Sequence, residues 1–295
     1  MQTYQELIGG LVQQIASDAV NGAEELARRS ADVIRTISEF DDSIGAKPLL
    51  DRIVEVSRKL IHAKPAMASI LHLANTVLGA IDRIDDSRVM RSEITRTIEQ
   101  WNASSRKSVQ AIASHASAMV RNGSVVLTHS FSSTVLATLL SAKQSSRDFG
   151  VICSESLPMG EGRRLGQELE KSGIAKRIIA DSEIAGAVQR ATVVFLGGDA
   201  VCDFGVINKV GSREIAAMAL RHNVPCHALC STCKLAPRTF RFSRKEYSEP
   251  GITIEGSYDL TPLEVLTAII TENGVCSPGK IKEEIARMRV HQRLL

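Results

Sequence analysis

The sequence predicts an α/β protein: an all-helical N-terminal domain followed by a Rossmann-like, doubly wound, mostly parallel sheet. In the first 121 residues, apolar side chains recur at intervals of three and four, as they do on the buried face of a helix. From residue 124 on, short apolar runs alternate with amphipathic stretches, which is typical of buried parallel strands connected by helices. We therefore predict a helical domain at residues 1–121 and a Rossmann-like ligand-binding domain at residues 122–295.

The N-terminal half has few runs of β-branched residues, and its spacing predicts several helices separated by Asp41-Asp42 and Lys64-Pro65. A long helix carries an apolar stripe from Ile94 to Met119, and the pair Asn122-Gly123 predicts its C-terminal cap. The earlier helices are expected near Glu24–Ser38, Leu49–His62 and Ala66–Ile81.

The second half reads as buried strands with amphipathic helices between them. Sheets of this kind bind ligands beyond the carboxyl ends of their strands, so the candidate functional residues are expected there. The strands are predicted at Val125–Thr128, Gly150–Cys153, Arg177–Ala180, Thr192–Leu196 and Val224–Leu229. The helices are predicted at Thr134–Gln144, Arg163–Lys171, Ile184–Arg190 and Arg213–His222.

The composition is that of an ordinary globular protein, with 295 residues, 44% of them hydrophobic and 23% charged. The net charge of +3 is too small and too dispersed to favour direct nucleic-acid binding. The longest uncharged stretch, Asn122–Ala142, contains Asn, His, Ser and Thr and is not typical of a membrane span. The first twenty residues lack a basic segment before an apolar run, so we expect no secretory signal. Six cysteines without such a signal favour reduced thiols in a cytoplasmic protein.

Small hydroxyl residues follow the first predicted strand, where the chain reads Thr128-His129-Ser130-Phe131-Ser132-Ser133. Hydroxyl side chains at a helix N-terminus suit a phosphate, because free backbone N–H groups and the helix dipole favour an anion. The alternative is simple N-capping of the following helix by Ser132 or Ser133. His129 is the one histidine placed at a predicted strand end, which makes it a candidate ligand-binding residue.

The fourth predicted strand ends in Gly197-Gly198-Asp199, and Asn208-Lys209 follows shortly after it. A carboxylate directly after two glycines has backbone room for a ligand and can act as an acid or a base. Lys209 can hold a phosphate as a point charge, with Asn208 supplying donors. Alternatively, Asp199 caps the next element and Lys209 is a solvated surface charge. Because these residues occur together at adjoining strand ends, we favour a ligand-binding site over the structural roles.

These residues lie within a pattern that resembles one protein family. It comprises methylthioribose-1-phosphate isomerase, ribose-1,5-bisphosphate isomerase, and the alpha, beta and delta subunits of the eukaryotic translation-initiation guanine-nucleotide exchange factor 2B. The match covers roughly residues 122–280 and is weak before that, where only Asn21-Gly22-Ala23 resembles the isomerases' Arg-Gly-Ala. The matching segments are Gly197-Gly-Asp-Ala-Val, Gly205-Val-Ile-Asn-Lys-Val-Gly211, Cys153-Ser-Glu-Ser-Leu-Pro158, Cys230-Ser-Thr-Cys-Lys-Leu-Ala-Pro237, Tyr258-Asp-Leu-Thr-Pro262 and Ile270-Thr-Glu-Asn-Gly274.

The resemblance implies a set of site residues and also shows where this chain departs from the isomerases. Asp199 and Ser130 occupy the catalytic positions, but the isomerases have a cysteine where this chain has Ser130. A serine hydroxyl is far less acidic than a thiol, whose pKa is about 8.5. Asn21 and Leu157 each replace an arginine, with loss of a bidentate phosphate donor. The implied ligand-binding residues are Asn21, Gly22, Ala23, His129, Ser132, Ser133, Glu155, Asn208, Lys209 and Lys234.

Two functions remain open at this point. Ser130, Asn21 and Leu157 favour a non-catalytic protein like the exchange factor's alpha subunit, which binds a phosphorylated ribose or a nucleoside monophosphate. Asp199 with Asn208-Lys209 favours an aldose–ketose isomerase that acts on a ribose 1-phosphate-type substrate. The resemblance implies a homodimer or a larger assembly of dimers in either case.

A cysteine cluster offers a third interpretation. Cys226, Cys230 and Cys233 have a spacing that can hold an iron–sulfur cluster, and His227 adds a zinc ligand. Their place on a buried strand instead favours small hydrophobic thiols, so we predict neither a metal nor a cofactor. Cys153 and Cys202 lie near strand ends, but nothing in the sequence indicates that either one replaces the missing catalytic thiol.

Overall fold

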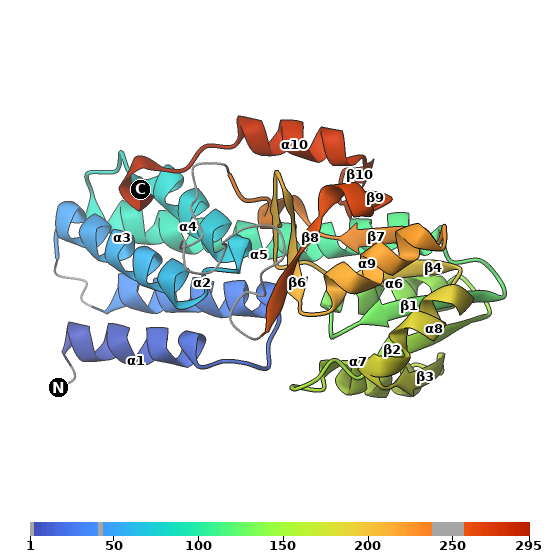
Figure 1. Cartoon of the computed structure of the whole chain (residues 1–295). Coiled ribbons are helices and arrows are strands. Elements are labelled where there is room, and N and C mark those ends of the chain that lie inside the picture. The colour runs from blue at the N-terminus through green and yellow to red at the C-terminus, as the bar shows by residue number, and fades with distance from the viewer. Residues whose placement is uncertain (1–2, 41–43, 238–256) are drawn as a thin grey trace. The chain divides into compact units, whose positions relative to one another are not determined.

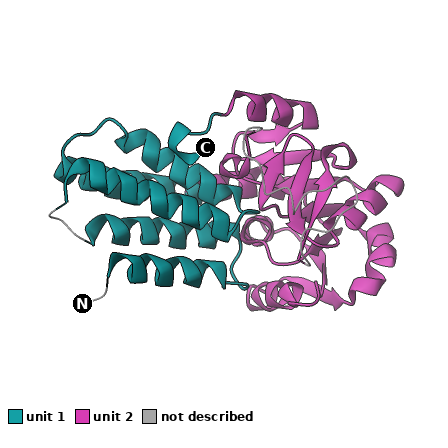
Figure 2. Ribbon diagram, turned by 60° about the vertical axis from the view of Figure 1, so that its left-hand side comes forward, with its two compact units in different colours: residues 1–106, 289–295 teal, residues 107–288 magenta. Residues whose placement is uncertain are grey.

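The computed structural model describes residues 3–40, 44–237 and 257–295 of the chain. Contacts between Cα atoms divide it into two compact units (Figure 2). The helical unit comprises Met1–Arg106 with Arg289–Leu295, and the sheet unit comprises Lys107–Met288. The predicted fold class, helices followed by a mostly parallel sheet, is confirmed. A domain boundary after residue 121 stays a prediction.

The helical unit consists of amphipathic helices whose apolar faces pack together. Leu26, Ile53 and Val77, from three different helices, are each almost completely buried. The last residues of the chain return to this unit, where the Arg293 Nε donates to Asp82 Oδ1 at 2.6 Å and the His291 backbone N–H donates to Asn75 Oδ1 at 2.6 Å. The helices are α1 (Tyr4–Ala16), α2 (Ala23–Glu39), α3 (Ala46–Ala63), α4 (Ala68–Ile81) and the first part of α5 (Ser87–Ser117).

The predicted cap of the long helix is wrong, because α5 ends at Ser117, before Asn122-Gly123. The Arg147 guanidinium donates to the Ser117 carbonyl oxygen and so satisfies one of the groups that a helix end leaves unpaired. Asn122 and Gly123 instead join the starts of two strands. The Gly123 N–H donates to the Asp148 carbonyl at 2.8 Å, and the Asp148 N–H donates to Asn122 Oδ1 at 2.9 Å.

The sheet unit is built on a seven-stranded sheet in the order β10-β9-β7-β4-β1-β2-β3 (Figure 1). All its neighbouring strands are parallel except β9 and β10. The five strands predicted from the sequence correspond to β1, β2, β3, β4 and β7, with small shifts at their ends. The strands are β1 (Ser124–His129), β2 (Phe149–Ser154), β3 (Ala175–Ile179), β4 (Val193–Leu196), β7 (Cys226–Leu229), β9 (Ala268–Thr271) and β10 (Gly274–Cys276).

Helices cover both faces of this sheet, because alternate side chains along each strand point to opposite sides. Leu127, Val194 and Ile269 pack in one buried cluster with α8 (Ile184–Arg190), α9 (Ser212–Arg221) and α10 (Pro278–Arg287). Their strand neighbours Val126, Val193 and Ile270 pack in a second cluster with the end of α5, with α6 (Ser133–Gln144) and with α7 (Glu161–Lys171). The strands are therefore buried on both sides, which explains their near-continuous apolar runs.

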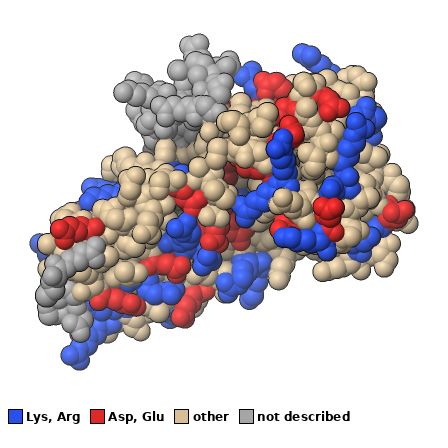
Figure 3. Space-filling view, turned by 90° about the horizontal axis from the view of Figure 1, so that it is seen from below, with Lys and Arg blue, Asp and Glu red and all other residues tan. Residues whose placement is uncertain are grey.

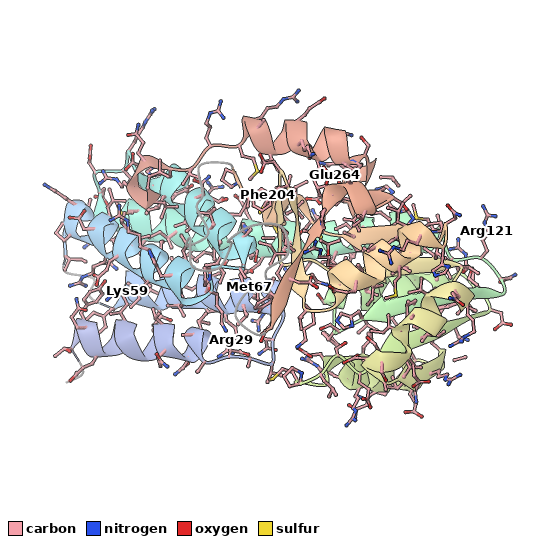
Figure 4. All side chains as sticks on the ribbon, in the orientation of Figure 1. Arg29, Lys59, Met67, Arg121, Phe204 and Glu264 are labelled. Atoms are coloured by element: carbon pink, nitrogen blue, oxygen red, sulfur yellow. The ribbon has the colours of Figure 1, made fainter. Side chains whose placement is uncertain are left out.

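A second, antiparallel sheet of three strands was not predicted. It contains β5 (Ala200–Cys202), β6 (Gly205–Lys209) and β8 (Tyr258–Pro262), in that order. The turn of the β5–β6 hairpin carries Phe204, whose relative exposure is 49% (Figure 4). Asn208 and Lys209 consequently lie at the end of β6, a strand of this second sheet. No local pattern predicts this sheet, because β6 and β8 are far apart in the chain.

Gly162, in the first turn of α7, provides a test of this packing. A Cβ atom there would lie 1.7 Å from the Ser154 carbonyl oxygen, which is backbone and cannot swing aside. We expect Gly162→Ala to lower the free energy of unfolding by about 2–3 kcal/mol in urea titrations. Gly186→Ala in α8 is the control, because its Cβ would meet nothing closer than the Arg190 guanidinium at 3.5 Å. Equal stability of wild type and Gly162→Ala would contradict the described contact of α7 with β2.

Candidate functional site

The candidate site lies where the strand order reverses. The chain proceeds from β1 outward to β2 and β3, and then returns to place β4 on the other side of β1. The connections that follow β1 and β4 therefore leave in opposite directions and open a crevice at their carboxyl ends. His129 ends β1, and Gly197-Gly198-Asp199 follows directly after β4.

Two glycines let the backbone after β4 approach its neighbours closely. A Cβ atom on Gly197 would lie 2.9 Å from Ser132 Cβ and 3.6 Å from Asn208 Oδ1. A Cβ atom on Gly198 would lie 2.4 Å from Cys230 Sγ. The end of β4 is thus packed against the start of α6, against β6 and against the end of β7, and any side chain at these two positions would separate them.

Lys234 fixes the orientation of the backbone just before Asp199. Its buried Nζ donates to the Gly198 carbonyl oxygen at 2.7 Å. The turn that carries Lys234 is held in turn by Glu272, which accepts from the Thr232 N–H at 2.9 Å and from the Thr232 hydroxyl at 2.6 Å. Lys234 therefore contacts the backbone of the candidate site.

His129 is buried, and both of its ring nitrogens are hydrogen-bonded. Nε2 donates to the Val210 carbonyl at 2.7 Å, so in the neutral ring Nδ1 accepts from the Ser154 hydroxyl at 2.6 Å. Burial lowers the pKa of His129, which keeps the ring neutral. Gly211, at a φ of +102°, lies so close that a Cβ atom would come within 3.1 Å of Nε2. His129 thus braces β1 against β2 and the end of β6.

Ser130 adopts a left-handed backbone conformation, with a φ of +64°, which is uncommon for a residue other than glycine. Its N–H donates to the Ser156 hydroxyl at 2.6 Å. Ser156 is itself left-handed, at a φ of +62°, and its N–H donates to Asp181 Oδ1 at 2.9 Å. Strained residues of this kind persist only where the surroundings hold them, and they occur often at functional sites.

Ser132 is the N-cap of α6, as one of the two sequence-based alternatives supposed. Its hydroxyl accepts from the Val135 N–H at 3.3 Å, and Ser133 is the first residue of the helix. The first N–H groups of an α-helix have no partners within the helix and attract anions. Capping by Ser132 and phosphate binding at this end are therefore compatible.

Lys209 is not a solvated surface charge. Its side chain is 6% exposed, and its Nζ donates to Glu161 Oε1 at 2.8 Å. Glu161 begins α7, and 20% of its side chain is exposed. A buried ion pair of this kind costs desolvation on both sides, so it is weak evidence for a purely stabilising role.

Asn208 and Asp259 face one another across β6 and β8 and both contact the start of α9. Asn208 Nδ2 donates to the Ser212 hydroxyl at 3.0 Å. Asp259 Oδ2 accepts from the N–H groups of Gly211 at 2.7 Å and Arg213 at 3.2 Å. The N-terminus of α9 is therefore already capped by a carboxylate, which leaves α6 as the better candidate for an anion.

Asp199 lies near Tyr258, the residue opposite Lys209 on β8. Burial raises the pKa of the Tyr258 hydroxyl, and the charges of Asp199 and Glu161 raise it further. Asp199 also acts on the Cys230 thiol, together with Lys234 and Glu272. The Asp199 N–H donates to the Ile207 carbonyl at 2.8 Å, which fixes its backbone to β6. A carboxylate, a phenol and an ammonium group thus gather beside the reversal in strand order.

The structure brings most of the predicted site residues to one edge of the sheet unit. These are His129, Ser130, Ser132, Ser133, Asp199, Asn208, Lys209 and Lys234. Glu155 follows β2 and is paired with Arg163, whose Nη2 lies 2.7 Å from Glu155 Oε1. Leu157, in the place of the family's arginine, is 51% exposed. Ligand binding by these residues stays a prediction.

Asn21, Gly22 and Ala23 belong to the helical unit. Asn21 Nδ2 donates to Asp18 Oδ2 at 2.8 Å, and Gly22 is the N-cap of α2. The Ala23 carbonyl accepts from the Ser69 hydroxyl at 3.1 Å. The Asn21 side chain therefore stabilises a local turn with Asp18.

Sequence reasoning missed the acidic partners of the site. Glu161, Asp181 and Asp259 come from α7, from the turn before α8, and from β8. Tyr258 and Asp259 lay within a recognised motif and could have been singled out there. Glu161 had no such signal, because its partner Lys209 lies 48 residues away.

All six cysteines are free thiols. Burial raises the pKa of Cys153, Cys226 and Cys230 to about 12, so each is un-ionised at neutral pH. Cys226 and His227 lie on β7, in the interior of the sheet. Within the described ranges, no three His, Cys, Asp or Glu side chains are arranged to hold a metal ion.

The model of the initiation factor 2 subunit family matches residues 19–278. The chain belongs to this family. It is 29% identical over 277 residues to the eIF-2B subunit 2-like translation initiation factor of Pyrococcus horikoshii, covering 92% of this chain and 96% of that protein. It is 24% identical over 288 residues to the ribose 1,5-bisphosphate isomerase of Methanocaldococcus jannaschii, covering 92% of each. The family thus includes both proteins named as initiation-factor subunits and proteins named as sugar-phosphate isomerases.

Solved structures of family members share the fold. The initiation factor eIF-2B of Pyrococcus horikoshii superimposes with a TM-score of 0.80 at 26% identity, covering 92% of this chain and 97% of that one. A chain of the tetrameric eIF2B beta2-delta2 complex of C. thermophilum gives a TM-score of 0.79 at 23% identity, covering 97% and 95%. The predicted membership of the initiation factor 2B and isomerase family is therefore confirmed.

On the face in Figure 3, Lys and Arg side chains are interspersed with Asp and Glu, so that face has no strong field of one sign.

No helix in the part of the chain that the structure describes is both long enough and apolar enough to cross a membrane.

Asp259 should give the stability of the protein a distinctive pH dependence. Burial raises its pKa from 3.8 to about 7, and the two backbone N–H groups offset this only in part. A carboxyl with a raised folded-state pKa contributes stability that is present below about pH 4 and lost as the pH rises through about 7. We therefore expect wild type to lose up to about 4 kcal/mol relative to Asp259→Asn over that range, measured by urea unfolding.

The control for this experiment is Glu264→Gln, because Lys282 lowers the pKa of Glu264 and reverses the sign. Its difference from wild type should grow, not shrink, as the pH rises through the acid range. A wild-type minus Asp259→Asn difference that stays constant from pH 4 to 8 would show that the α9 N–H groups keep Asp259 ionised.

Proposed function

We propose that this chain binds a phosphorylated ribose or a nucleoside monophosphate beside the reversal in strand order, as a non-catalytic subunit-like protein. The observation that carries the proposal is the chemistry at the end of β1. Position 130, where the family's isomerases have their catalytic cysteine, is a serine whose backbone is held by Ser156. A serine hydroxyl gives up its proton too reluctantly to act unaided as the second acid or base.

Two buried thiols near the site are poorly suited to take over that role. One of them is Cys230, whose Sγ packs against Gly198, directly before Asp199. It is completely buried, and its pKa is raised to about 12. Cys153, at the end of β2, is equally buried with a pKa near 12. A group with such a pKa transfers protons poorly at neutral pH.

The start of α6 supports the phosphate part of the proposal. Ser132 and Ser133 begin a twelve-residue helix, and their hydroxyls lie at the end where backbone N–H groups favour an anion. Asp259 occupies the corresponding end of α9, so we assign the phosphate to α6. His129, neutral and fully hydrogen-bonded, would then shape the site without contacting the phosphate.

Assembly with other chains is the second part of the proposal. Related initiation-factor subunits are found in a tetrameric complex, and the sequence resemblance implies dimers as the building unit. We propose that this protein forms a homodimer or a larger assembly of dimers. Its free thiols fit a cytoplasmic location, and the proposed ligand requires no cofactor.

An aldose–ketose isomerase is the alternative function. It is favoured by the relatives named ribose 1,5-bisphosphate isomerase and by Asp199, whose backbone is fixed by Lys234 and β6. In that reaction Asp199 would move a proton between the first and second carbons of the sugar. The remaining difficulty is the partner acid, for which only Ser130 lies at the expected position.

Lys209 provides the test of ligand binding. Lys209→Ala removes a charged donor from the site, so we expect ribose phosphates to bind about 1–3 kcal/mol more weakly in calorimetry. Ligands would first be chosen by a thermal-shift screen of ribose phosphates and nucleoside monophosphates. Lys171→Ala is the matched control, because Lys171 forms an exposed 2.8 Å pair with Glu168 on α7. Unchanged affinity in Lys209→Ala would remove this residue from the site.

Turnover distinguishes the two functions. We expect little or no isomerisation of methylthioribose-1-phosphate or ribose-1,5-bisphosphate, because loss of one positioned acid or base costs about 10²–10⁴-fold in rate. Ser130→Cys is expected to raise any residual rate, and an NMR assay of the purified protein measures both substrates directly. Turnover at an ordinary enzymatic rate that is abolished by Asp199→Asn would establish the isomerase instead.

A further inference from the structure

Three asparagines of this chain are each followed directly by a glycine, at Asn21-Gly22, Asn122-Gly123 and Asn273-Gly274. Such an asparagine is chemically labile, because a glycine has no side chain to hinder attack by its backbone nitrogen on the asparagine side chain. None of the three glycines is crowded, since a Cβ atom built on any of them would meet nothing within 4 Å beyond its chain neighbours. Hydrogen bonds, and not space, therefore distinguish the three sites.

The first two of these asparagines are held in place. Asn122 Oδ1 accepts from the Asp148 N–H at 2.9 Å, while the Gly123 N–H donates to the Asp148 carbonyl at 2.8 Å. Both groups that would have to react are thus bonded to the same residue, at the start of the paired strands β1 and β2. Asn21 donates through Nδ2 to Asp18 Oδ2 at 2.8 Å and through its backbone N–H to Oδ1 at 3.0 Å. A reaction at either site first has to break these bonds.

Asn273 lies instead in the tight turn between β9 and β10 and is exposed. Its backbone N–H donates to Thr271 Oγ1 at 3.2 Å, but its side-chain amide has no hydrogen bond to any residue that the structure describes. Gly274 follows at a φ of +111°, in the left-handed region that favours glycine, and begins β10 opposite Thr271. Because β10 has three residues and forms the edge of the sheet, local opening costs little there. The fold thus restrains this asparagine less than the other two.

We infer that Asn273 is the site at which this protein deamidates spontaneously. The Gly274 nitrogen bonds to Cγ of Asn273 and passes its proton to the side-chain amide nitrogen, whose bond to Cγ breaks so that it leaves as ammonia. Water then opens the cyclic succinimide. Hydrolysis of the new bond to Cγ gives aspartate, and hydrolysis of the bond to the backbone carbonyl carbon gives isoaspartate, in which the chain runs through the former side chain.

The products alter a turn that supports the candidate functional site. Glu272, directly before Asn273, accepts from the Thr232 N–H at 2.9 Å and from the Thr232 hydroxyl at 2.6 Å, and Lys234 lies in the same turn as Thr232. Either product adds a carboxylate beside Glu272, and isoaspartate also inserts a methylene group into the backbone there. Like charges repel, so deamidation weakens the hold of Glu272 on Thr232.

The test follows all three sites on the full chain. The purified protein is incubated in mildly alkaline buffer, and mass spectrometry of its peptides measures conversion of each asparagine to aspartate and isoaspartate. We expect Asn273 to convert at least about tenfold faster than Asn21 or Asn122, because a turn at a sheet edge opens far more often than hydrogen-bonded strand starts. In urea-unfolded protein the three rates should converge, since the hydrogen bonds that distinguish them are gone.

Three results would overturn the inference. One is conversion of Asn21 or Asn122 in the folded protein at the rate of Asn273. Another is the same lead of Asn273 in the unfolded chain, because the fold would then have no part in the selection. The third is the absence of conversion at all three sites in the folded protein.

Asn273→Gln is the variant that isolates the site. Glutamine keeps the amide but would have to close a larger and less favourable ring, so an isoaspartyl methyltransferase assay should detect much less isoaspartate than in wild type. Asn122→Gln is the matched control and should keep nearly the wild-type amount. Isoaspartate that persists in Asn273→Gln would contradict the assignment, and the wild-type peptide map decides the matter even if a variant does not fold.

Hydrogen exchange tests the effect on the turn. Deamidated protein, separated from fresh protein by ion exchange, should exchange the Thr232 N–H at least about threefold faster, because local opening becomes easier. The Gly211 N–H, which Asp259 holds at 2.7 Å, is the control and should be unchanged. Equal protection of Thr232 in both forms would overturn the effect on the turn.

Discussion

The close approach of the backbone after β4 to its neighbours is the constraint on which the candidate site depends. Gly197 packs against Ser132 and Gly198 against Cys230, at separations that a Cβ atom would not allow. This approach brings the start of α6, the end of β6 and the end of β7 to the same crevice. Lys234 then fixes the Gly198 carbonyl, so the backbone that presents Asp199 is held from two sides. Any ligand that binds here meets elements whose spacing the two glycines determine.

Around this point, acidic side chains hold the loops by accepting from backbone N–H groups. Asp181 accepts from Ser156 and Leu157, Asp259 from Gly211 and Arg213, and Glu272 from Thr232. A hydrogen bond to an ionised carboxylate is stronger than a neutral one, and for Asp259, whose pKa is raised to about 7, it forms fully only above that pH. The site is therefore organised by carboxylates, and the ammonium group of Lys209 is already neutralised.

Membership of the family and the presence of an activity are separate questions for this protein. The fold, the motif with Asn208 and Lys209, and the position of Asp199 are compatible with both kinds of relative. Whether such a protein is an isomerase or a non-catalytic subunit depends on how readily a few groups in the site give up a proton. A thiol at the end of β1 could act as an acid at neutral pH, whereas the Ser130 hydroxyl and the buried Cys230 thiol cannot do so readily. Function on this fold is therefore decided by the site and not by the architecture.

The sequence by itself determined the features that depend on neighbours along the chain. Apolar periodicity marked most of the helices, though not α1 or α10, and five strands of the large sheet, because burial on one or both faces leaves a local pattern. Ser132 was one of two candidate caps for the same local reason. The end of α5 was misplaced, since Ser117 is capped by Arg147, a residue from a later turn. Strands β9 and β10 were missed, because short strands at one edge of a sheet leave little periodicity to detect.

Only the tertiary structure decided the contacts between distant residues. The β5-β6-β8 sheet pairs Lys209 with Tyr258, and α7 supplies Glu161 to the same lysine. No local pattern predicts such partners, because the sequence around a carboxylate on a helix surface is the same whether the carboxylate contacts water or a buried ammonium group. The sequence therefore named Lys209 and Asp199 as candidates but could not show how each is held. Whether Lys209 is a free cation or half of a buried pair is settled by packing, because its partner Glu161 comes from a distant helix.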